Sequence, residues 1–430
     1  MTAPKTDNAD IDTEVESVED FAARARAWIQ DNLKRSDPAA HIGVMRNEGS
    51  DEEEVALVAR ERELQRMFYD EGFAGICIPR EYGGRGLTRA HLKAFDDALG
   101  GYEYPARLQS PTFAPCVGVI LDYGTEEQKK QHIPAILKGE EIWMQFLSEP
   151  SGGSDVAGAL TTAVRDGDEW VLNGSKIWTT GAWWSDWALC LARTNWDVPK
   201  HRGLTVFMLP LRQPGIEVHR IELLNGSREF CQEYLTDVRV PDSDRVGEID
   251  NGWKVGTGWM FHERMAHHSP YTTMPAGSAR GGSRVPELVE VLQDSGRVDD
   301  PISRDLIGEA RMFDVVKDAL QQRISRGIAK KTMSDQAASI ARLMTGVAAV
   351  RSTAIGYELT DASGAAWDSD DGAVAERGVD NLMRQVSTIA GGTTEMARNA
   401  ISERLLGMPR EQTHDVNLAF RDVPRGRSGS

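Results

Sequence analysis

The feature that most limits the possible folds is a change of pattern, from helical to strand-like and back. Within residues 141–245, short strand-like runs follow one another without intervening helices, at 187–192, 204–210, 216–223 and 230–240. On both sides of this block, apolar residues recur at helical spacing. We therefore expect an α+β fold with an N-terminal α-helical domain, a middle antiparallel β-barrel and a C-terminal helical bundle.

One turn signal inside the block is strong. Asn173-Gly174-Ser175 lies between the apolar runs 169–172 and 176–179. Asn-Gly suits the backbone of a tight hairpin turn, so the pattern predicts a β-hairpin centred on Gly174.

The same patterns divide the chain into five parts. Residues 1–16 are rich in Asp, Glu and Thr and are expected to form an acidic disordered tail. Residues 17–140 form an expected N-terminal α-helical domain, in which Thr125 and Gln128 make a capping box. Its apolar faces are predicted to include Phe21, Ala25, Trp28, Ile29, Leu33, Val55, Val58, Leu64, Met67 and Phe68. A middle β domain (141–245), a C-terminal α-helical domain (246–410) and a C-terminal tail (411–430) follow.

Charge and cysteine content exclude several classes of protein. With 49 basic and 66 acidic residues the net charge is −17, which argues against binding to nucleic acid or to an anionic membrane surface. The four cysteines lie far apart, and no apolar run is long enough to cross a bilayer. We expect a cytoplasmic protein with reduced thiols.

Familiar cofactor and metal motifs are missing. The sequence has neither a GxGxxG after a strand nor a GxxxxGK, so a doubly wound nucleotide domain is unsupported. His262 and His267 resemble a zinc-protease pair, but their spacing of five turns the second side chain away from the first on a helix. We expect no metal site.

A candidate ligand-binding loop is the stretch from Phe146 to Gly158. An apolar run ends there in small, hydroxylated and turn-forming residues. Such a segment exposes backbone N–H groups and lets a ligand approach the main chain closely. A polar linker between domains would have the same composition.

Several separate motifs resemble those of the acyl-CoA dehydrogenase flavoenzymes, and they occur in the same order over almost the whole chain. They are Ile78-Pro79-Arg80-Glu81-Tyr82-Gly83-Gly84, Tyr123-Gly124-Thr125-Glu126-Glu127-Gln128-Lys129, Ser148-Glu149-Pro150 with Gly153-Ser154-Asp155, Asn173 to Thr180, and Gly391-Gly392-Thr393-Thr394-Glu395 followed by Glu403-Arg404-Leu405-Leu406-Gly407. The resemblance implies an enzyme that holds FAD between the middle domain and the C-terminal helices and oxidises the Cα–Cβ bond of an acyl-CoA thioester to give the 2-enoyl-CoA.

The resemblance also implies roles for individual residues. The residues expected to bind FAD are Phe146, Leu147, Ser148, Trp178, Thr180, Thr393 and Glu395. Of these, Trp178 would pack against the isoalloxazine ring and Thr180 would hydrogen-bond near N5. Ser154 matches a position that contacts the CoA part of the thioester.

The catalytic base needs a separate argument. Abstraction of an α-proton from a thioester requires a carboxylate base. Many members of the family carry a glutamate at the position of Gly391. Glycine has no side chain that could act as the base. A smaller group places the glutamate on an earlier helix, directly before an arginine, and Glu263-Arg264 matches that place. We expect Glu263 to be the base and Arg264 to orient it or to bind the thioester tail.

Departures from the family pattern point to a subgroup. The Arg-x-x-Phe-Gly segment, through which a neighbouring subunit holds FAD, is not visible in 269–336, and the usual Gly-Gly-x-Gly-Tyr segment is replaced within 359–367. These changes resemble actinobacterial dehydrogenases that act on bulky acyl-CoAs such as sterol side chains, some built from two different chains. A homo-oligomer (dimer or tetramer) and a hetero-oligomer with a related chain both remain possible, and the resemblance implies an electron-transferring flavoprotein as acceptor.

Two alternative functions stay open. One is a flavin-dependent monooxygenase on the same fold, in which His262, His267 or His268 takes the place of the carboxylate. The other is a non-catalytic subunit of a two-chain enzyme, suggested by the altered FAD segments. The sequence does not define the length or shape of the acyl group.

Overall fold

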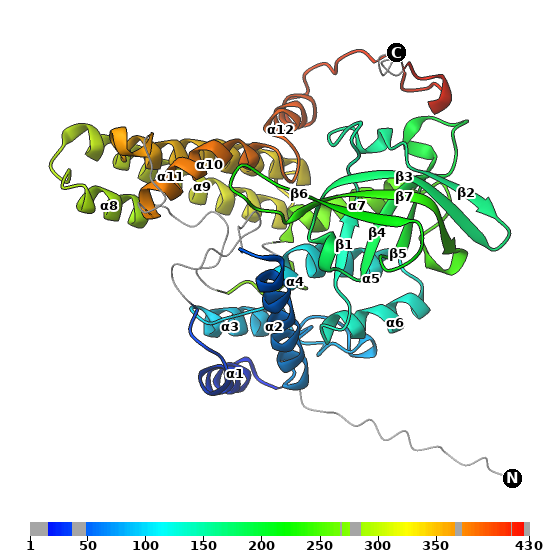
Figure 1. Ribbon diagram of the computed structural model, residues 1–430, viewed down its shortest axis with the longest axis horizontal. Helices are drawn as coiled ribbons and strands as arrows, with labels where there is room; N and C mark the ends of the chain where they lie inside the picture. Colours follow the sequence, from blue (N-terminus) through cyan, green and yellow to red (C-terminus); the bar gives the residue numbers. More distant parts are fainter. Residues whose placement is uncertain are drawn as a thin grey trace, which may run out of the picture.

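The structure, a computed structural model, describes residues 16–36, 49–266, 269–275, 285–365, 372–413 and 415–424. N-terminal helices, a β-sheet and C-terminal helices follow one another along the chain, which is the α–β–α order expected from the sequence. Figure 1 shows α8 to α11 as an elongated bundle on one side of the sheet, with the N-terminal helices below both. The first fifteen residues of the expected acidic tail lie outside the described residues.

The N-terminal helices form where the sequence predicts them. They are α1 (Val18–Asn32), α2 (Asp51–Asp70), α3 (Arg89–Leu99), α4 (Ala106–Leu108), α5 (Gly118–Tyr123) and α6 (Glu126–Leu137), with a π-helix over Gln109–Val117. The capping box of Thr125 and Gln128 at the start of α6 is confirmed. Phe21 and Phe68 are buried as expected, whereas Val55 is 49% exposed. Val55 lies in the first turns of α2, next to the buried Glu54 and Val58, but its own side chain faces solvent.

The middle part is a single eight-stranded sheet. Its strands are β1 (Trp143–Phe146), β2 (Thr162–Asp166), β3 (Glu169–Thr180), β4 (Trp187–Arg193), β5 (Leu204–Pro210), β6 (Ile216–Ile221), β7 (Phe230–Pro241) and β8 (Arg245–Val246). The order is β6-β7-β3-β2-β4-β5-β8, with β1 beside β4. Most neighbours are antiparallel, but β1 and β4 run parallel, as does the short contact of β2 with β4.

The predicted hairpin at Gly174 is wrong. Residues 169–180 form one continuous strand, β3, and the tight turn lies earlier, between β2 and β3 at Gly167 and Asp168. Gly174 instead marks a register shift in the pairing of β3 with β7. A Cβ at Gly174 would lie 2.4 Å from Oγ1 of Thr161, so glycine is needed there for close approach of two backbones.

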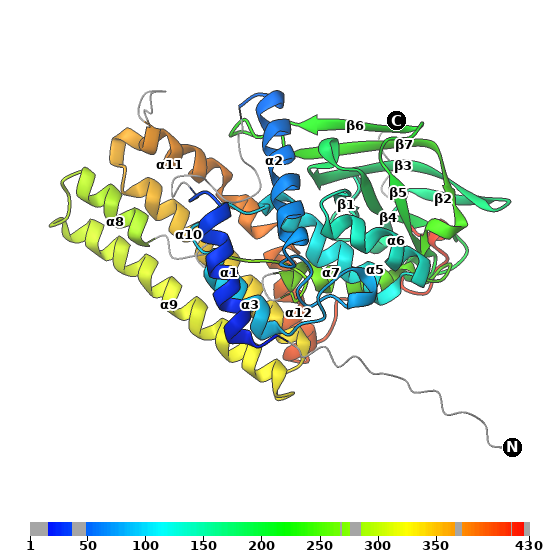
Figure 2. The same cartoon turned by 90° about the horizontal axis from the view of Figure 1, so that it is seen from below.

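The C-terminal helices begin directly after the sheet. They are α7 (Gly252–Arg264), α8 (Val285–Asp294), α9 (Pro301–Ala329), α10 (Ala338–Glu358), α11 (Gly372–Met383) and α12 (Thr394–Ala400), which continues as a π-helix over Ile401–Leu405. Figure 2 shows the long helix α9 at the outer edge of this bundle, with α10 and α11 on its inner side. Within the described ranges, no helix combines the length and the apolar character that a membrane crossing requires.

The expected C-terminal tail is docked where it is described. Phe420 is buried, and its ring stacks on Trp196 at a centroid distance of 5.4 Å. The guanidinium of Arg193 lies 3.7 Å from the centroid of the Phe420 ring. The chain therefore returns from the C-terminal helices to the loop between β4 and β5.

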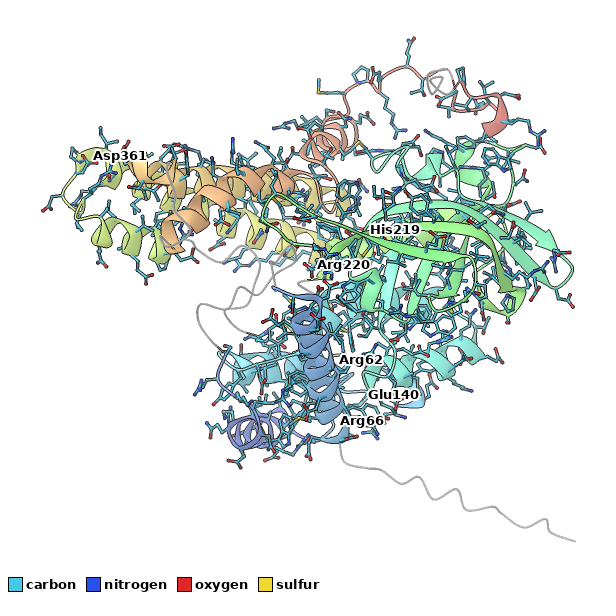
Figure 3. All side chains as sticks on the ribbon, viewed as in Figure 1. Arg62, Arg66, Glu140, His219, Arg220 and Asp361 are labelled. Atoms are coloured by element: carbon cyan, nitrogen blue, oxygen red, sulfur yellow. The ribbon has the colours of Figure 1, made fainter. Side chains whose placement is uncertain are left out.

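Ion pairs join α2 to the segments around it. Arg62 binds Asp186, the residue before β4, at 2.7 Å, and Arg66 binds Glu140, just beyond α6, at 2.9 Å. Figure 3 shows Arg62, Arg66 and Glu140 close together on one side of α2. The N-terminal helices are thereby held against the sheet.

The close approach at Gly174 yields a stability prediction. Replacing Gly174 by Ala should lower the free energy of unfolding by about 1–3 kcal/mol, because the new methyl group overlaps Thr161. Gly308→Ala is the matched control: it lies inside α9 with open space at its Cβ position, and it should stabilise by about 0.5–1 kcal/mol. Thermal and denaturant unfolding of the two variants would measure the difference, and a neutral Gly174→Ala would contradict the close approach.

Candidate functional site

The most unusual backbone in the sheet belongs to Trp178. It lies in β3 with φ at 68°, a left-handed conformation that is rare for a bulky residue, and the pairing register shifts between Ile177 and Thr179. The side chain is 53% exposed, and its only described ring contact is an edge-on one with Phe230 at 6.0 Å. A strained bulge thus displays a large aromatic surface, as expected for a residue that binds a planar ligand.

A buried ion pair supports the strand beside this bulge. Nζ of Lys176 lies 2.8 Å from Oε1 of Glu149, and both side chains are buried. Lys176 also donates to the carbonyls of Leu191 at 2.6 Å and Leu147 at 3.4 Å. Burial alone would raise the pKa of Glu149, but Lys176 and the backbone N–H of Leu160 together hold it below its ordinary value.

The same ion pair positions the candidate loop. Glu149 accepts the N–H groups of Leu160 and Thr161, so its carboxylate closes the loop that contains Ser151 to Gly158. The carbonyl of Ser148 accepts the N–H of Ile177 at 3.0 Å, which places Ser148 beside the bulge. The Phe146 side chain is fully buried in the core of the sheet, which leaves its backbone for the expected contact with FAD, and that contact stays a prediction.

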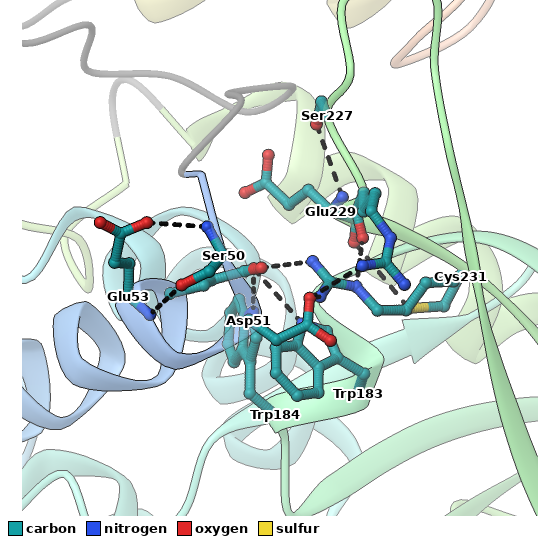
Figure 4. Close-up of polar contacts among 11 residues, drawn as sticks. Ser50, Asp51, Glu53, Trp183, Trp184, Ser227, Glu229 and Cys231 are labelled. Carbon is teal, nitrogen blue, oxygen red and sulfur yellow. Dashed lines mark hydrogen bonds and ion pairs between the residues drawn. The ribbon is translucent and has the colours of Figure 1, made fainter.

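A second cluster fixes the chain just after Thr180. Glu54, at the start of α2, accepts the indole N–H groups of Trp184 at 3.0 Å and Trp183 at 3.3 Å and forms an ion pair with Arg220. Arg220 also stacks on Trp183 at 4.3 Å. Figure 4 shows the first turn of α2, with Ser50 and Asp51, facing these tryptophans and the residues Ser227 to Cys231. The segment after β3 is therefore fixed by Glu54 of α2 and by Arg220 of β6.

The candidate base Glu263 lies in the last turn of α7. The side chain is partly buried, and burial raises the pKa of its carboxyl, against the opposing effect of Arg264. Its charge in turn helps to raise the pKa of the Cys116 thiol, although burial of that thiol contributes more. Cys116 lies in the π-helix, so Glu263 faces the interior between α7 and this helix.

The motif that begins with Gly391-Gly392-Thr393 lies next to the end of α7. A Cβ at Gly392 would lie 3.7 Å from Nη2 of Arg264, so the Gly391–Thr393 turn is adjacent to Arg264. Arg342 fixes this turn by donating to the carbonyls of Ser387 and Ala390. Gly391 and Gly392 have φ of 71° and 92°, so a glutamate at either position would be strained.

The other expected cofactor and substrate residues are accessible. The hydroxyl of Thr393 caps α12 by accepting the N–H of Met396 at 3.1 Å, and Glu395 is exposed and paired with Arg398 at 3.1 Å. Ser154 is exposed in the loop that Glu149 closes. The described contacts bring Arg264 to Gly392, the residue before Thr393, and Ser148 to Ile177, the residue before Trp178, but none joins Ser154 or Glu395 to Glu263.

The histidines near Glu263 have other roles or lie outside the description. Nε2 of His262 lies 2.8 Å from Oδ2 of Asp122 on α5. A Cβ at Gly118 would lie 2.6 Å from the His262 ring, so the imidazole packs tightly against the π-helix and α5. His262 therefore joins two helices, which does not favour the monooxygenase alternative. His267 and His268 are not among the described residues.

Sequence reasoning missed two polar residues near the bulge, the buried Glu233 and the partly buried Gln145. Glu233 on β7 has no exposed surface, accepts the hydroxyl of Thr179 at 3.0 Å, and its Oε1 has no hydrogen-bond partner. Burial raises its pKa to about 8. Gln145 on β1 accepts the indole N–H of Trp259. The only sequence signal was that Gln145 interrupts the apolar run from Ile142 to Leu147.

Together these features describe a site for a planar ligand and a reaction that moves a proton. An exposed indole offers an apolar surface. Two residues with hydroxyl groups belong to the same region: Thr180 lies two residues further along β3, and Ser148 is hydrogen-bonded through its carbonyl to Ile177. A partly buried carboxylate with a raised pKa is suited to accept a proton from carbon near neutral pH.

Comparison with known proteins agrees with this description. Residues 16–140 match the family model "Acyl-CoA dehydrogenase, N-terminal domain", and residues 145–238 match "Acyl-CoA dehydrogenase, middle domain". The chain is 31% identical over 410 residues to acyl-CoA dehydrogenase IpdE1 of Mycobacterium tuberculosis, which covers 92% of this chain and 99% of IpdE1. IpdE1 of Mycolicibacterium smegmatis is equally similar, at 31% identity over 92% of this chain and 98% of that protein.

Solved structures give the same result. The Tcur3481-Tcur3483 steroid ACAD superimposes with a TM-score of 0.71 at 28% identity, covering 92% of this chain and 98% of the matched chain. The ChsE4-ChsE5 complex from Mycobacterium tuberculosis has the same fold, with a TM-score of 0.67 at 24% identity over 92% of this chain and 98% of the matched chain. From its sequence, its two matched domains and its fold, this chain belongs to the acyl-CoA dehydrogenase family.

Proposed function

We propose that this acyl-CoA dehydrogenase catalyses α,β-dehydrogenation of a bulky acyl-CoA, of the kind derived from a steroid side chain, with Glu263 as the base. The observation that carries the proposal is the partly buried Glu263 carboxyl at the end of α7, beside the Gly391–Thr393 turn where no other base can stand. The steroid connection is supported by the resemblance to IpdE1 and to the Tcur3481-Tcur3483 steroid ACAD.

The cofactor is FAD, on which members of this family depend. When bound, FAD accepts the hydride from Cβ of the acyl group. The residues present fit such a group, because Trp178 offers an exposed aromatic face that no other described ring covers. The residues that would hold FAD are Trp178 and Thr180 on β3, the backbone from Phe146 to Ser148, and Thr393 with Glu395 on α12.

The protein side of the reaction follows from the placement of these groups. Glu263 removes the α-proton of the thioester, and its raised pKa makes it a stronger base than an exposed glutamate. Arg264 on the same turn orients the carboxylate and faces the thioester tail. Ser154, exposed on its loop, contacts the CoA portion.

Open space beside α7 supports a bulky acyl group. Gly256 is buried, yet a Cβ placed there would meet nothing within 4 Å. Gly256 and Glu263 are seven residues apart, so they share one face of the helix at a separation of about 10 Å. A wide acyl group therefore has room next to the base.

An apolar surface supports an oligomer. Met312, Val315 and Val316 on α9 are each at least 45% exposed and lie within about one helical turn. Such a stripe on a long outer helix is typical of a covered interface. We propose a partner chain of the same fold, either a second copy or a related subunit like those in the named Tcur3481-Tcur3483 and ChsE4-ChsE5 assemblies. An electron-transferring flavoprotein in the cytoplasm is the proposed acceptor. None of the four cysteines, all of them among the described residues, forms a disulfide, which fits that compartment.

The role of Glu263 is tested by Glu263→Gln, which keeps the size of the side chain and removes the base. We expect the rate of enoyl-CoA formation to fall by about 10²–10⁴-fold. The flavin content of the purified protein should not change, because Glu263 is not among the FAD-binding residues. Stopped-flow bleaching of the flavin by acyl-CoA measures the rate, and Glu248→Gln, an exposed glutamate before α7, is the control. Full activity of Glu263→Gln would exclude it as the base.

The pH profile gives an independent check. Because the base must be ionised and burial raises its pKa, kcat/KM should rise with pH around a midpoint above 4.5, the ordinary value. Arg264 opposes this shift, so Arg264→Gln should move the midpoint to still higher pH. A midpoint that moves down in Arg264→Gln would contradict the assignment.

The open space at Gly256 predicts substrate selectivity. Gly256→Leu would place four additional carbon atoms beside α7 and should lower kcat/KM for a steroid side-chain acyl-CoA by at least about tenfold, since misplacement of a substrate by an ångström is costly. A short straight-chain acyl-CoA should be affected much less. Steady-state assays with both substrates would decide, and equal losses would show that the space does not receive the acyl group.

A further inference from the structure

A chain of hydrogen bonds links the helix that carries Glu263 to the strand that carries Trp178. The indole N–H of Trp259 on α7 donates to Oε1 of Gln145 on β1. The backbone carbonyl of Gln145 accepts the hydroxyl of Thr179 on β3 at 3.4 Å. Gln145 is therefore joined to α7 through its side chain and to β3 through its backbone.

The two ends of this chain lie next to the proposed reacting groups. Trp259 precedes Glu263 by four residues, so both side chains lie on the same face of α7. Thr179 stands between Trp178 and Thr180, the two residues of β3 proposed to contact the flavin. A displacement of α7 relative to β3 would thus change the distance from the base to the flavin.

The link is buried. Trp259 has no exposed surface, and Thr179 is 3% exposed. In such surroundings a polar group that loses its partner costs about 1–3 kcal/mol, so the link resists stretching. A surface hydrogen bond would have exchanged its partner for water at little cost.

The far end of the chain is fixed by Glu233. Its Oε2 lies 3.0 Å from the hydroxyl of Thr179. That hydroxyl has a single proton but faces two oxygen atoms, Oε2 of Glu233 and the carbonyl of Gln145. The contact with Glu233 is the shorter one, so its carboxyl accepts the hydroxyl, and the carbonyl of Gln145 is the second, longer acceptor of the same proton.

We propose that Gln145 is a positioning residue that sets the separation between the Glu263 carboxylate and the flavin-binding segment Trp178–Thr180, through Trp259 on one side and Thr179 on the other. This inference rests on the proposed function, because it takes Glu263 as the base and β3 as the flavin-binding strand. Gln145 touches neither reactant; it acts by holding two elements that do.

Two substitutions each break the hydrogen bond between Trp259 and Gln145 and keep a large side chain at the substituted position. Trp259→Phe deletes the indole N–H, and Gln145→Met deletes the side-chain acceptor. Each variant should lower the single-turnover rate of flavin bleaching by acyl-CoA by about tenfold to a hundredfold, as expected for a misplaced base. Flavin content and the half-saturating acyl-CoA concentration should stay within about twofold. The double variant should be no slower than the slower single variant, because both changes break the same bond.

A second readout does not depend on turnover. Amide hydrogen exchange of the flavin-loaded protein without substrate should become faster in 176–182 and in the last two turns of α7 when Trp259 is replaced by Phe. The matched control is Trp253→Phe on the same helix, whose ring packs on His201 at 4.8 Å and whose indole N–H has no partner among the described residues. This control should leave the bleaching rate and the exchange of 176–182 unchanged.

The outcomes separate this inference from the proposed function. Wild-type bleaching rates in both Trp259→Phe and Gln145→Met would overturn the positioning role even if Glu263→Gln were inactive. A rate per bound flavin equal to wild type, together with a lower melting temperature, would show that the link is structural only and would also overturn it. An active Glu263→Gln would instead overturn the assignment of the base.

Discussion

The buried ion pair of Lys176 with Glu149 is the interaction on which the site depends. Lys176 belongs to β3, and Glu149 belongs to the loop after β1. Removing either partner would leave an unpaired charge in the protein interior, at a cost of about 3–5 kcal/mol. The pair joins the strand with Trp178 to the loop with Ser154, so a single charge contact holds together the two segments proposed to bind the flavin and the thioester.

Local features were predictable from the sequence, and long-range ones were not. Capping boxes and strand periodicity depend on residues a few positions apart, which is why the Thr125 cap and most strands were placed within a few residues. The hairpin turn predicted at Asn173-Gly174 was wrong, because glycine is required there by its close contact with Thr161, and a local sequence pattern contains no information on such a contact. The candidate roles of Trp178 and Glu263 came from the resemblance to the family. The contact of Gln145 with Trp259 joins residues 114 positions apart, so only the three-dimensional structure reveals it.

The two glycines before Thr393 agree with a base placed on α7, as proposed for Glu263. Both have left-handed backbones, which glycine adopts without strain and a glutamate does not. A second carboxylate at this turn would therefore be strained. Exchange between the two arrangements would require a new backbone at the turn as well as a new side chain.

The docked C-terminal segment has a mechanical consequence. Because Phe420 is buried against Trp196 and Arg193, the segment that follows α12 is attached to the sheet as well as to the helices. Residues 406–413 and 415–419 belong to the connection between the two attachment points, and the number of residues in this connection limits its length. The helical bundle can swing away from the sheet only as far as this connection reaches, so any wider opening, such as release of a tightly held cofactor, must begin with the detachment of one aromatic ring.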